Sequence, residues 1–130
     1  YVKTIEIEAK TLKEMLLKDF LPAVSSYAST VAENTMSVKT FVPSMDTASA
    51  QSLVSSLGDA YEKILDSLKE LEKELPTIEQ FQSVQESADY CYKTVLATMA
   101  LLRSYADQAE EKIPESHLPY PTYDRLLFSI

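Results

Sequence analysis

The sequence predicts an all-α fold, an antiparallel bundle of three long helices with a proline-rich C-terminal tail. Apolar residues recur at steps of three and four along three long stretches, which is the spacing of one buried helix face. The breaks between these stretches carry prolines and the small polar residues that cap helices. Residues 1–130 are expected to form a single helical domain, because a chain of this length buries enough surface for one core.

The first helix is expected over about residues 2–38. Its apolar face consists of Ile5, Ala9, Leu12, Leu16, Phe20, Ala23, Tyr27 and Val31. Pro22 lies inside this pattern, where it lacks a backbone donor and its ring clashes with the carbonyl four residues earlier. We therefore expect a kink at residues 18–21.

The second helix is expected over about residues 47–74, after a connection at 38–46 whose Ser44 and Asp46 are both candidate caps. Its seam consists of Leu57, Tyr61, Ile64, Leu68, Leu71 and Leu75. Gly58 interrupts it, either for a close helix approach or as an exposed glycine. Pro76 is expected to end this helix.

The third helix is expected over about residues 78–113. Thr77 and Gln80 have the spacing of a capping box, and Pro114 follows the last apolar position. The narrow stripe consists of Phe81, Val84, Ala88, Cys91, Val95, Met99, Leu102, Ala106, Ala109 and Ile113. Because the preceding turn is short, the second and third helices should be antiparallel neighbours.

A second apolar stripe lies beside the first around Pro22, formed by Leu17, Leu21, Val24 and Ala28. One interpretation is a wider core, closed by the 38–46 connection or by the tail. The other is a docking face for another domain or subunit.

Composition argues against several functions. The net charge of −8 disfavours nucleic acid and membrane surfaces as partners. One His, one Cys and one Gly can supply neither a zinc set nor a phosphate-binding loop. The acidic residues of the second helix, Glu74 among them, alternate with lysines and are expected to be solvated. We expect no catalytic, cofactor or metal site, and with a lone cysteine and no membrane span, a cytoplasmic location.

The tail covers residues 114–130. Pro119 and Pro121 predict an extended backbone before a short apolar turn. The residues expected to pack are Pro119, Pro121, Tyr123, Leu126, Leu127 and Phe128. They either fold back onto one end of the bundle or act as a free ligand for an aromatic groove, and the first is favoured because an exposed Leu-Leu-Phe run is a liability.

Both ends of the chain resemble type III glutamine synthetases, the large bacterial class. The run Pro-x-Pro-x-Tyr-x-x-Leu-Leu-Phe at 119–128 is similar to the C-terminus of that family. The sequences YVKTI at 1–5 and LPAV at 21–24 resemble the long helix that leaves its catalytic domain. Leu118 departs from the pattern, since an aromatic residue, usually Trp, is expected there.

The resemblance implies a parent enzyme that joins glutamate and ammonia with ATP and magnesium or manganese, assembled as stacked rings. Its catalytic residues would lie upstream. The first methionine is Met15, so we expect a fragment of a longer protein. Its implied role is a C-terminal structural domain that packs on the catalytic domain of the same chain within a homo-oligomer. The alternative is an independent helical interaction or scaffold module, which would bind a partner helix through the same seams.

Overall fold

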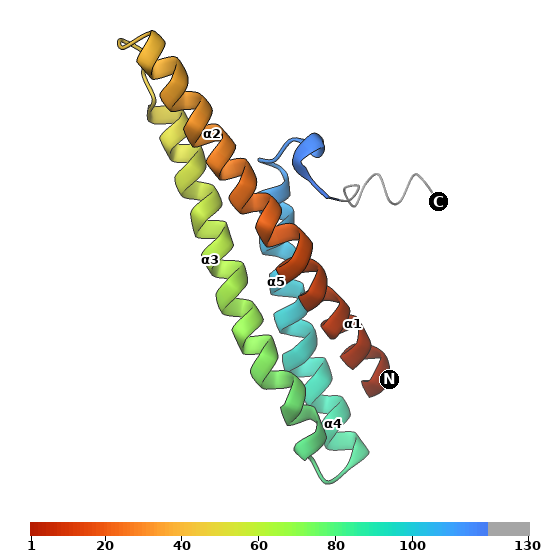
Figure 1. Ribbon diagram of the computed structural model, residues 1–130. Coiled ribbons are helices and arrows are strands. Elements are labelled where there is room, and N and C mark those ends of the chain that lie inside the picture. Colours follow the sequence, from red (N-terminus) through yellow and green to blue (C-terminus); the bar gives the residue numbers. More distant parts are fainter. Residues whose placement is uncertain (120–130) are drawn as a thin grey trace.

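A computed structural model describes residues 1–119 of the chain (Figure 1). These residues form three long helical segments and contain no strand, which confirms the all-α prediction. None of the described helices is long and apolar enough to cross a membrane.

The first segment comprises α1 (Val2–Met15), a π-helical turn η1 (Leu16–Phe20) and α2 (Leu21–Phe41). In the π turn the N–H of Leu21 donates to the carbonyl of Leu16, five residues back. Pro22 follows at once, in the first turn of α2. The segment is therefore irregular close to the proline, through a π turn that ends two residues before it, while the expected kink stays a prediction.

The second segment, α3 (Ala48–Thr77), continues into a short 3-10 turn η2 (Ile78–Gln80). The backbone N–H of Ala48 donates to Asp46 Oδ1 at 2.9 Å, so Asp46 stabilises the helix start. Pro76 lies inside the helix, and the prediction that it ends the helix was wrong. A proline this close to the C-terminus removes a single bond from a helix that tertiary packing holds in place.

The third segment comprises α4 (Val84–Tyr90), a second π turn η3 (Cys91–Val95) and α5 (Leu96–Glu110), followed by a 3-10 turn η4 (Glu115–His117). The expected capping box at Thr77 is absent: the Thr77 hydroxyl donates to the carbonyl of Lys73, four residues back. Ser83 caps the helix instead, accepting from the N–H of Glu86 at 3.1 Å. The helix therefore begins six residues later than expected, and the turn before it is longer.

The three segments lie side by side, with α2 and α5 both in contact with α3 (Figure 1). Their shared core contains the following fully buried large side chains: Leu16, Phe20, Leu21, Val24, Leu57, Ile64, Leu68, Leu71, Ile78, Val95, Met99 and Leu102. Both π turns contribute to this core, through Phe20 and Val95. In Figure 1, α2 and α3 extend together well beyond the end of α5.

Candidate functional site

The four residues of the predicted docking face do not share one environment. Leu21 and Val24 are 2% and 1% exposed, inside the core of the chain. Ala28 is half-buried against the same core. Leu17 is 36% exposed. The burial of Leu21 and Val24 agrees with a wider core, so only Leu17 of the four offers a partner an exposed side chain, and the docking role stays a prediction.

The tail is described only at its beginning. His117 packs its ring on Tyr27 of α2, with 5.0 Å between the ring centroids. Leu118 is half-buried against the core, and Pro119 is exposed. The other expected packing residues, Pro121, Tyr123, Leu126, Leu127 and Phe128, lie outside the described residues, so their packing stays a prediction.

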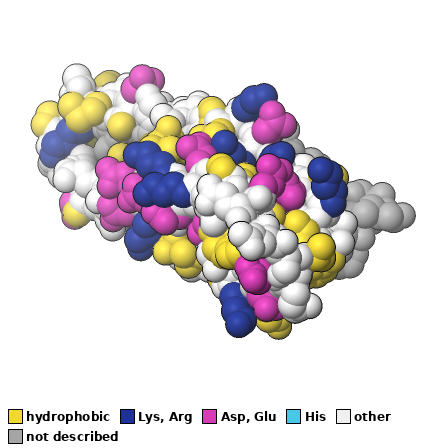
Figure 2. All heavy atoms as spheres, turned by 90° about the horizontal axis from the view of Figure 1, so that it is seen from below, with side chains coloured by type: hydrophobic (Ala, Val, Ile, Leu, Met, Phe, Trp, Pro, Cys, Tyr) yellow, Lys and Arg dark blue, Asp and Glu magenta, His cyan; other side chains and the backbone are white. Residues whose placement is uncertain are grey.

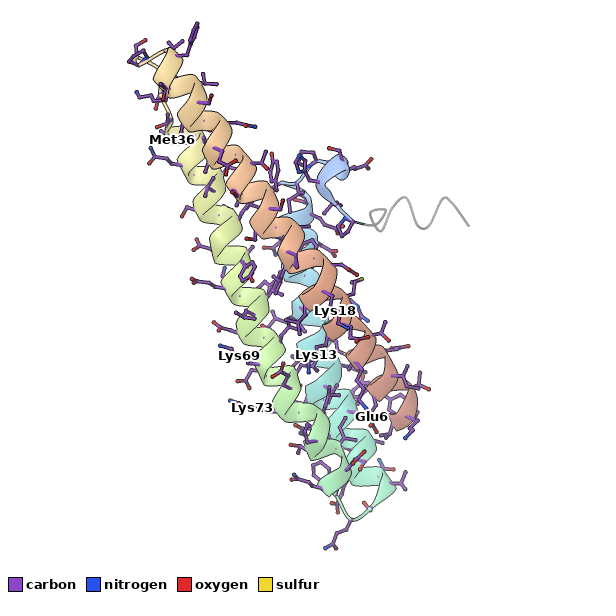
Figure 3. All side chains as sticks on the ribbon, viewed as in Figure 1. Glu6, Lys13, Lys18, Met36, Lys69 and Lys73 are labelled. Atoms are coloured by element: carbon purple, nitrogen blue, oxygen red, sulfur yellow. The ribbon has the colours of Figure 1, made fainter. Side chains whose placement is uncertain are left out.

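An apolar groove lies between the ends of α2 and α3, with a volume of about 530 Å³. We call it the hairpin groove. It is lined by Ala32, Thr35, Met36, Lys39, Thr47, Ala50, Gln51, Val54 and Ser55. Figure 3 shows Met36 near this end of the pair, away from the other labelled residues. The Lys39 ammonium donates to the carbonyl of Met45 at 2.7 Å, which closes the far end of the hairpin.

The same end of the molecule carries exposed apolar side chains. Met36 is 64%, Val38 47%, Phe41 87% and Val42 44% exposed, all within seven residues of sequence. Over the face shown in Figure 2, by contrast, acidic and basic side chains are interspersed. Within the described chain, the hairpin end therefore has the closest grouping, along the sequence, of exposed large apolar side chains.

A buried carboxyl group was missed in the sequence. Glu74 is 9% exposed, whereas it was expected on a solvated face. It lies on a row with steps of four, three and four that contains Ser67, Leu71, Glu74 and Ile78, all buried. That row was visible in the sequence, but the alternating charges around Glu74 obscured it.

The surroundings of Glu74 favour its neutral form. Its Oε2 accepts a hydrogen bond from Thr98 Oγ1 of α5 at 2.8 Å, while its buried Oε1 has no partner among the described residues. Burial raises the pKa of Glu74, the hydrogen bond from Thr98 lowers it, and the charge of Glu70 raises it further. The hydrogen bond between this carboxyl group and the Thr98 hydroxyl is a structural contact between α3 and α5, and Glu74 belongs to no group of three metal-ligating side chains within the described residues.

The described residues offer little other chemistry. No three His, Cys, Asp or Glu side chains within residues 1–119 are grouped closely enough to hold a metal ion. The Cys91 thiol is buried, and burial raises its pKa, so it is a poor nucleophile. Lys13 of α1, labelled in Figure 3, pairs with Glu72 of α3 at 3.4 Å, and such partly exposed pairs contribute little stability. Among the described residues, the exposed apolar surfaces remain as functional candidates.

Known proteins similar to this chain are glutamine synthetases. A family model described as the glutamine synthetase C-terminal domain matches residues 1–39. A glutamine synthetase of Butyrivibrio fibrisolvens is 34% identical over 130 residues, covering all of this chain and 19% of the relative. A type-3 glutamine synthetase of Dictyostelium discoideum is 27% identical over 132 residues, covering 98% of this chain and 18% of the relative. No solved structure matches the chain.

The chain thus spans about a fifth of the length of these relatives. The family model covers α1, η1 and nearly all of α2, and the two relatives align along essentially the whole chain. The resemblance noted in the sequence is confirmed, and the chain belongs to the glutamine synthetase family as a relative of the C-terminal domain of the type III enzymes.

Proposed function

We propose that the chain is the C-terminal structural and assembly domain of a type III glutamine synthetase. The parent enzyme would ligate glutamate and ammonia to glutamine with ATP and magnesium or manganese, as a cytoplasmic homo-oligomer of stacked rings. The observation that carries the proposal is the alignment of the whole chain with only about a fifth of two glutamine synthetases. The comparisons do not favour the alternative of an independent scaffold module.

The residues of the described chain do not fit the cofactors of that reaction. Residues 1–119 contain no cluster of metal-ligating side chains. Their single glycine, Gly58, lies inside a helix, so there is no glycine-rich loop to surround phosphate groups. We therefore assign ATP, metal and glutamate binding to the rest of the parent enzyme, and no step of ligation to this domain.

The first segment is the part of the domain that we assign to contact with the catalytic domain of the same chain. The match to the family model at residues 1–39 supports this choice, because it spans α1, η1 and most of α2. Leu17 is the exposed apolar residue of the π turn η1. Leu21 and Val24 are buried and would act indirectly, by keeping this segment packed on α3 and α5.

The test is Leu17→Asp in the full-length enzyme, with Leu101→Asp in α5 as the matched control. Both leucines are partly exposed, at 36% and 45%, so neither change should unfold the domain. A charge at a docking surface is costly because it must lose its hydration when the surface is covered. We expect Leu17→Asp to reduce oligomer size in light scattering or to lower the thermal midpoint, and Leu101→Asp to change neither.

Equal behaviour of the two variants, with oligomer size and stability unchanged, would remove the docking role of Leu17. The absence of catalysis from the domain is tested separately. The 130-residue chain alone should form no glutamine from glutamate, ammonia and ATP under conditions in which the full-length enzyme is active. Turnover by the isolated chain would overturn the assignment of ATP and metal binding to the rest of the enzyme.

A further inference from the structure

The hairpin groove is the continuation of the core. On α3, Val54 and Ala50 precede the fully buried Leu57 at steps of three and four, so they lie on the same helix face, and Thr47, at the N-cap position, lies three residues before Ala50. On α2, Ala32 lies four residues beyond Ala28, which is half-buried against the core. The two faces that enclose the core between α2 and α3 therefore continue into the groove.

The third segment does not cover this continuation. α5 ends at Glu110, and the Lys112 ammonium just beyond it donates to the hydroxyl of Ser56. The end of α5 is thus level with Ser56, and the first two turns of α3 extend past it together with the end of α2, as Figure 1 shows. At this end two helices present an apolar face that a third helix covers elsewhere in the molecule.

The chain leaves α5 in a position to reach this face. His117 lies on Tyr27, and Leu118 continues with extended torsion angles, φ −92° and ψ 138°. A helix rises about 1.5 Å per residue. The groove residues of α2 therefore start at Ala32, about 8 Å along the helix axis from Tyr27, and end at Lys39, about 18 Å from it. An extended chain spans about 20 Å from His117 to Tyr123 and about 36 Å to Phe128. The chain beyond His117 is therefore long enough to bring residues 123–128 to any part of the groove.

The chemistry of this segment matches the groove. Residues 123–128 read Tyr-Asp-Arg-Leu-Leu-Phe, with four large apolar side chains in six positions. The groove is lined mainly by alanine, valine, methionine and threonine side chains. A consecutive Leu-Leu-Phe run left in water is unfavourable, and so is an uncovered apolar helix face.

We propose that the hairpin groove is the binding site for residues 123–128 of the same chain. The tail then completes the core at the end that α5 does not reach, with Leu126, Leu127 and Phe128 against Val54 and Ala50. A segment tethered at His117 has an effective concentration in the millimolar range, so it occupies the groove ahead of a second copy of the chain. This assignment does not depend on the proposed function.

The experiment is site-specific photo-cross-linking in the full-length protein. A benzophenone amino acid replaces Val54 in the groove, or Ser52 as the control, which is exposed on the same helix and is not part of the lining. The protein is prepared as a mixture of isotopically light and heavy chains, so that mass spectrometry separates links within one chain from links between chains. We expect position 54 to join residues 123–128 within one chain, and position 52 not to do so.

Three results would overturn the proposal. They are a link from position 54 to the same segment of a different copy, a link to another part of the protein, and no link at all. A second variant makes the test quantitative: Leu127→Asp should lower the yield of the intrachain link at least about tenfold, because a carboxylate resists transfer into an apolar groove. Asp124→Ser is the control and should keep the yield. An undiminished link in Leu127→Asp would show that apolar contact does not hold the segment.

Discussion

Replacing Glu74 by glutamine should stabilise the protein at neutral pH. Glu74 is 9% exposed, and within residues 1–119 its carboxyl group has one hydrogen-bond donor, Thr98 Oγ1, for two oxygens. A buried carboxylate in this position is incompletely solvated, whereas a neutral amide of the same shape is not penalised for charge. Glu74→Gln keeps an acceptor for Thr98 and adds a donor.

The expected dependence on pH follows from the direction of the shift. Because burial raises the pKa of Glu74 above the ordinary 4.5, the folded protein binds more protons than the unfolded chain between the two pKa values. The stability associated with protonated Glu74 is complete below pH 4.5 and is lost as the pH rises through the raised pKa of the folded state. Above that raised pKa the folded protein carries the penalty of the buried charge.

The size of this penalty follows from two opposing contributions. An unsatisfied buried polar group costs about 1–3 kcal/mol, and more when it is charged. Glutamine avoids the added cost of the charge and keeps a neutral hydrogen bond with Thr98, worth about 0.5–1.5 kcal/mol against about 1.5–3 kcal/mol for the carboxylate. We expect Glu74→Gln to raise the free energy of unfolding by about 1 kcal/mol near neutral pH, and to have little effect below the ordinary carboxyl pKa.

The assay is urea unfolding followed by far-ultraviolet circular dichroism over a series from about pH 3.5, below the ordinary carboxyl pKa, to about pH 7.5. Glu62→Gln is the matched control, because Glu62 is exposed on the same helix. If Glu74→Gln is less stable than the parent near neutral pH, or keeps the parent's full pH dependence, the reasoning is refuted. Either result would mean that the folded state stabilises the ionised form.

Three further changes probe the fold, each measured as a shift in the urea midpoint. Phe20→Ala should destabilise by about 3–5 kcal/mol, because Phe20 is fully buried in the π turn η1; a loss under about 1 kcal/mol would mean that the turn is not packed as described. Ser83→Ala should cost about 1 kcal/mol through the lost cap of α4, and Ser83→Asp should retain stability; equal losses in both would exclude capping. Gly58→Ala should stabilise by about 0.5–1 kcal/mol, because Gly58 is exposed in α3 and an added Cβ meets no atom within 4 Å; destabilisation would indicate a close contact at that position.

The sequence was least informative where one signal competed with another. The proline at 76 and the capping-box spacing at Thr77 are local signals for a helix boundary, but α3 runs through Pro76 to Thr77, and the 3-10 turn η2 that follows packs Ile78 into the core. Ser83, the residue that caps α4, has the same S-x-x-E form with Glu86, so the signal was present at a second position. Which of two equivalent capping signals starts the helix depends on how distant segments of the chain pack together.

The two apolar stripes on the first segment illustrate the same limit. Periodicity placed Leu21 and Val24 beside the main face, but it cannot say whether a neighbouring face is covered by the chain or by a partner. The structure buries both in the chain's own core. The π turn η1 contributes to this difference, because an extra residue in one turn rotates the following face relative to the preceding one.

By itself, the sequence determined that the described chain is helical and indicated most of the residues that line the main core, because a buried helix face imposes its period on the sequence locally. Its two ends also indicated the family. Only the tertiary structure decided that Glu74 is buried, that π turns interrupt two helical segments, and that α5 stops level with Ser56 and leaves the hairpin groove open. These features depend on the relative lengths and axial positions of segments far apart in the chain, which no local pattern encodes.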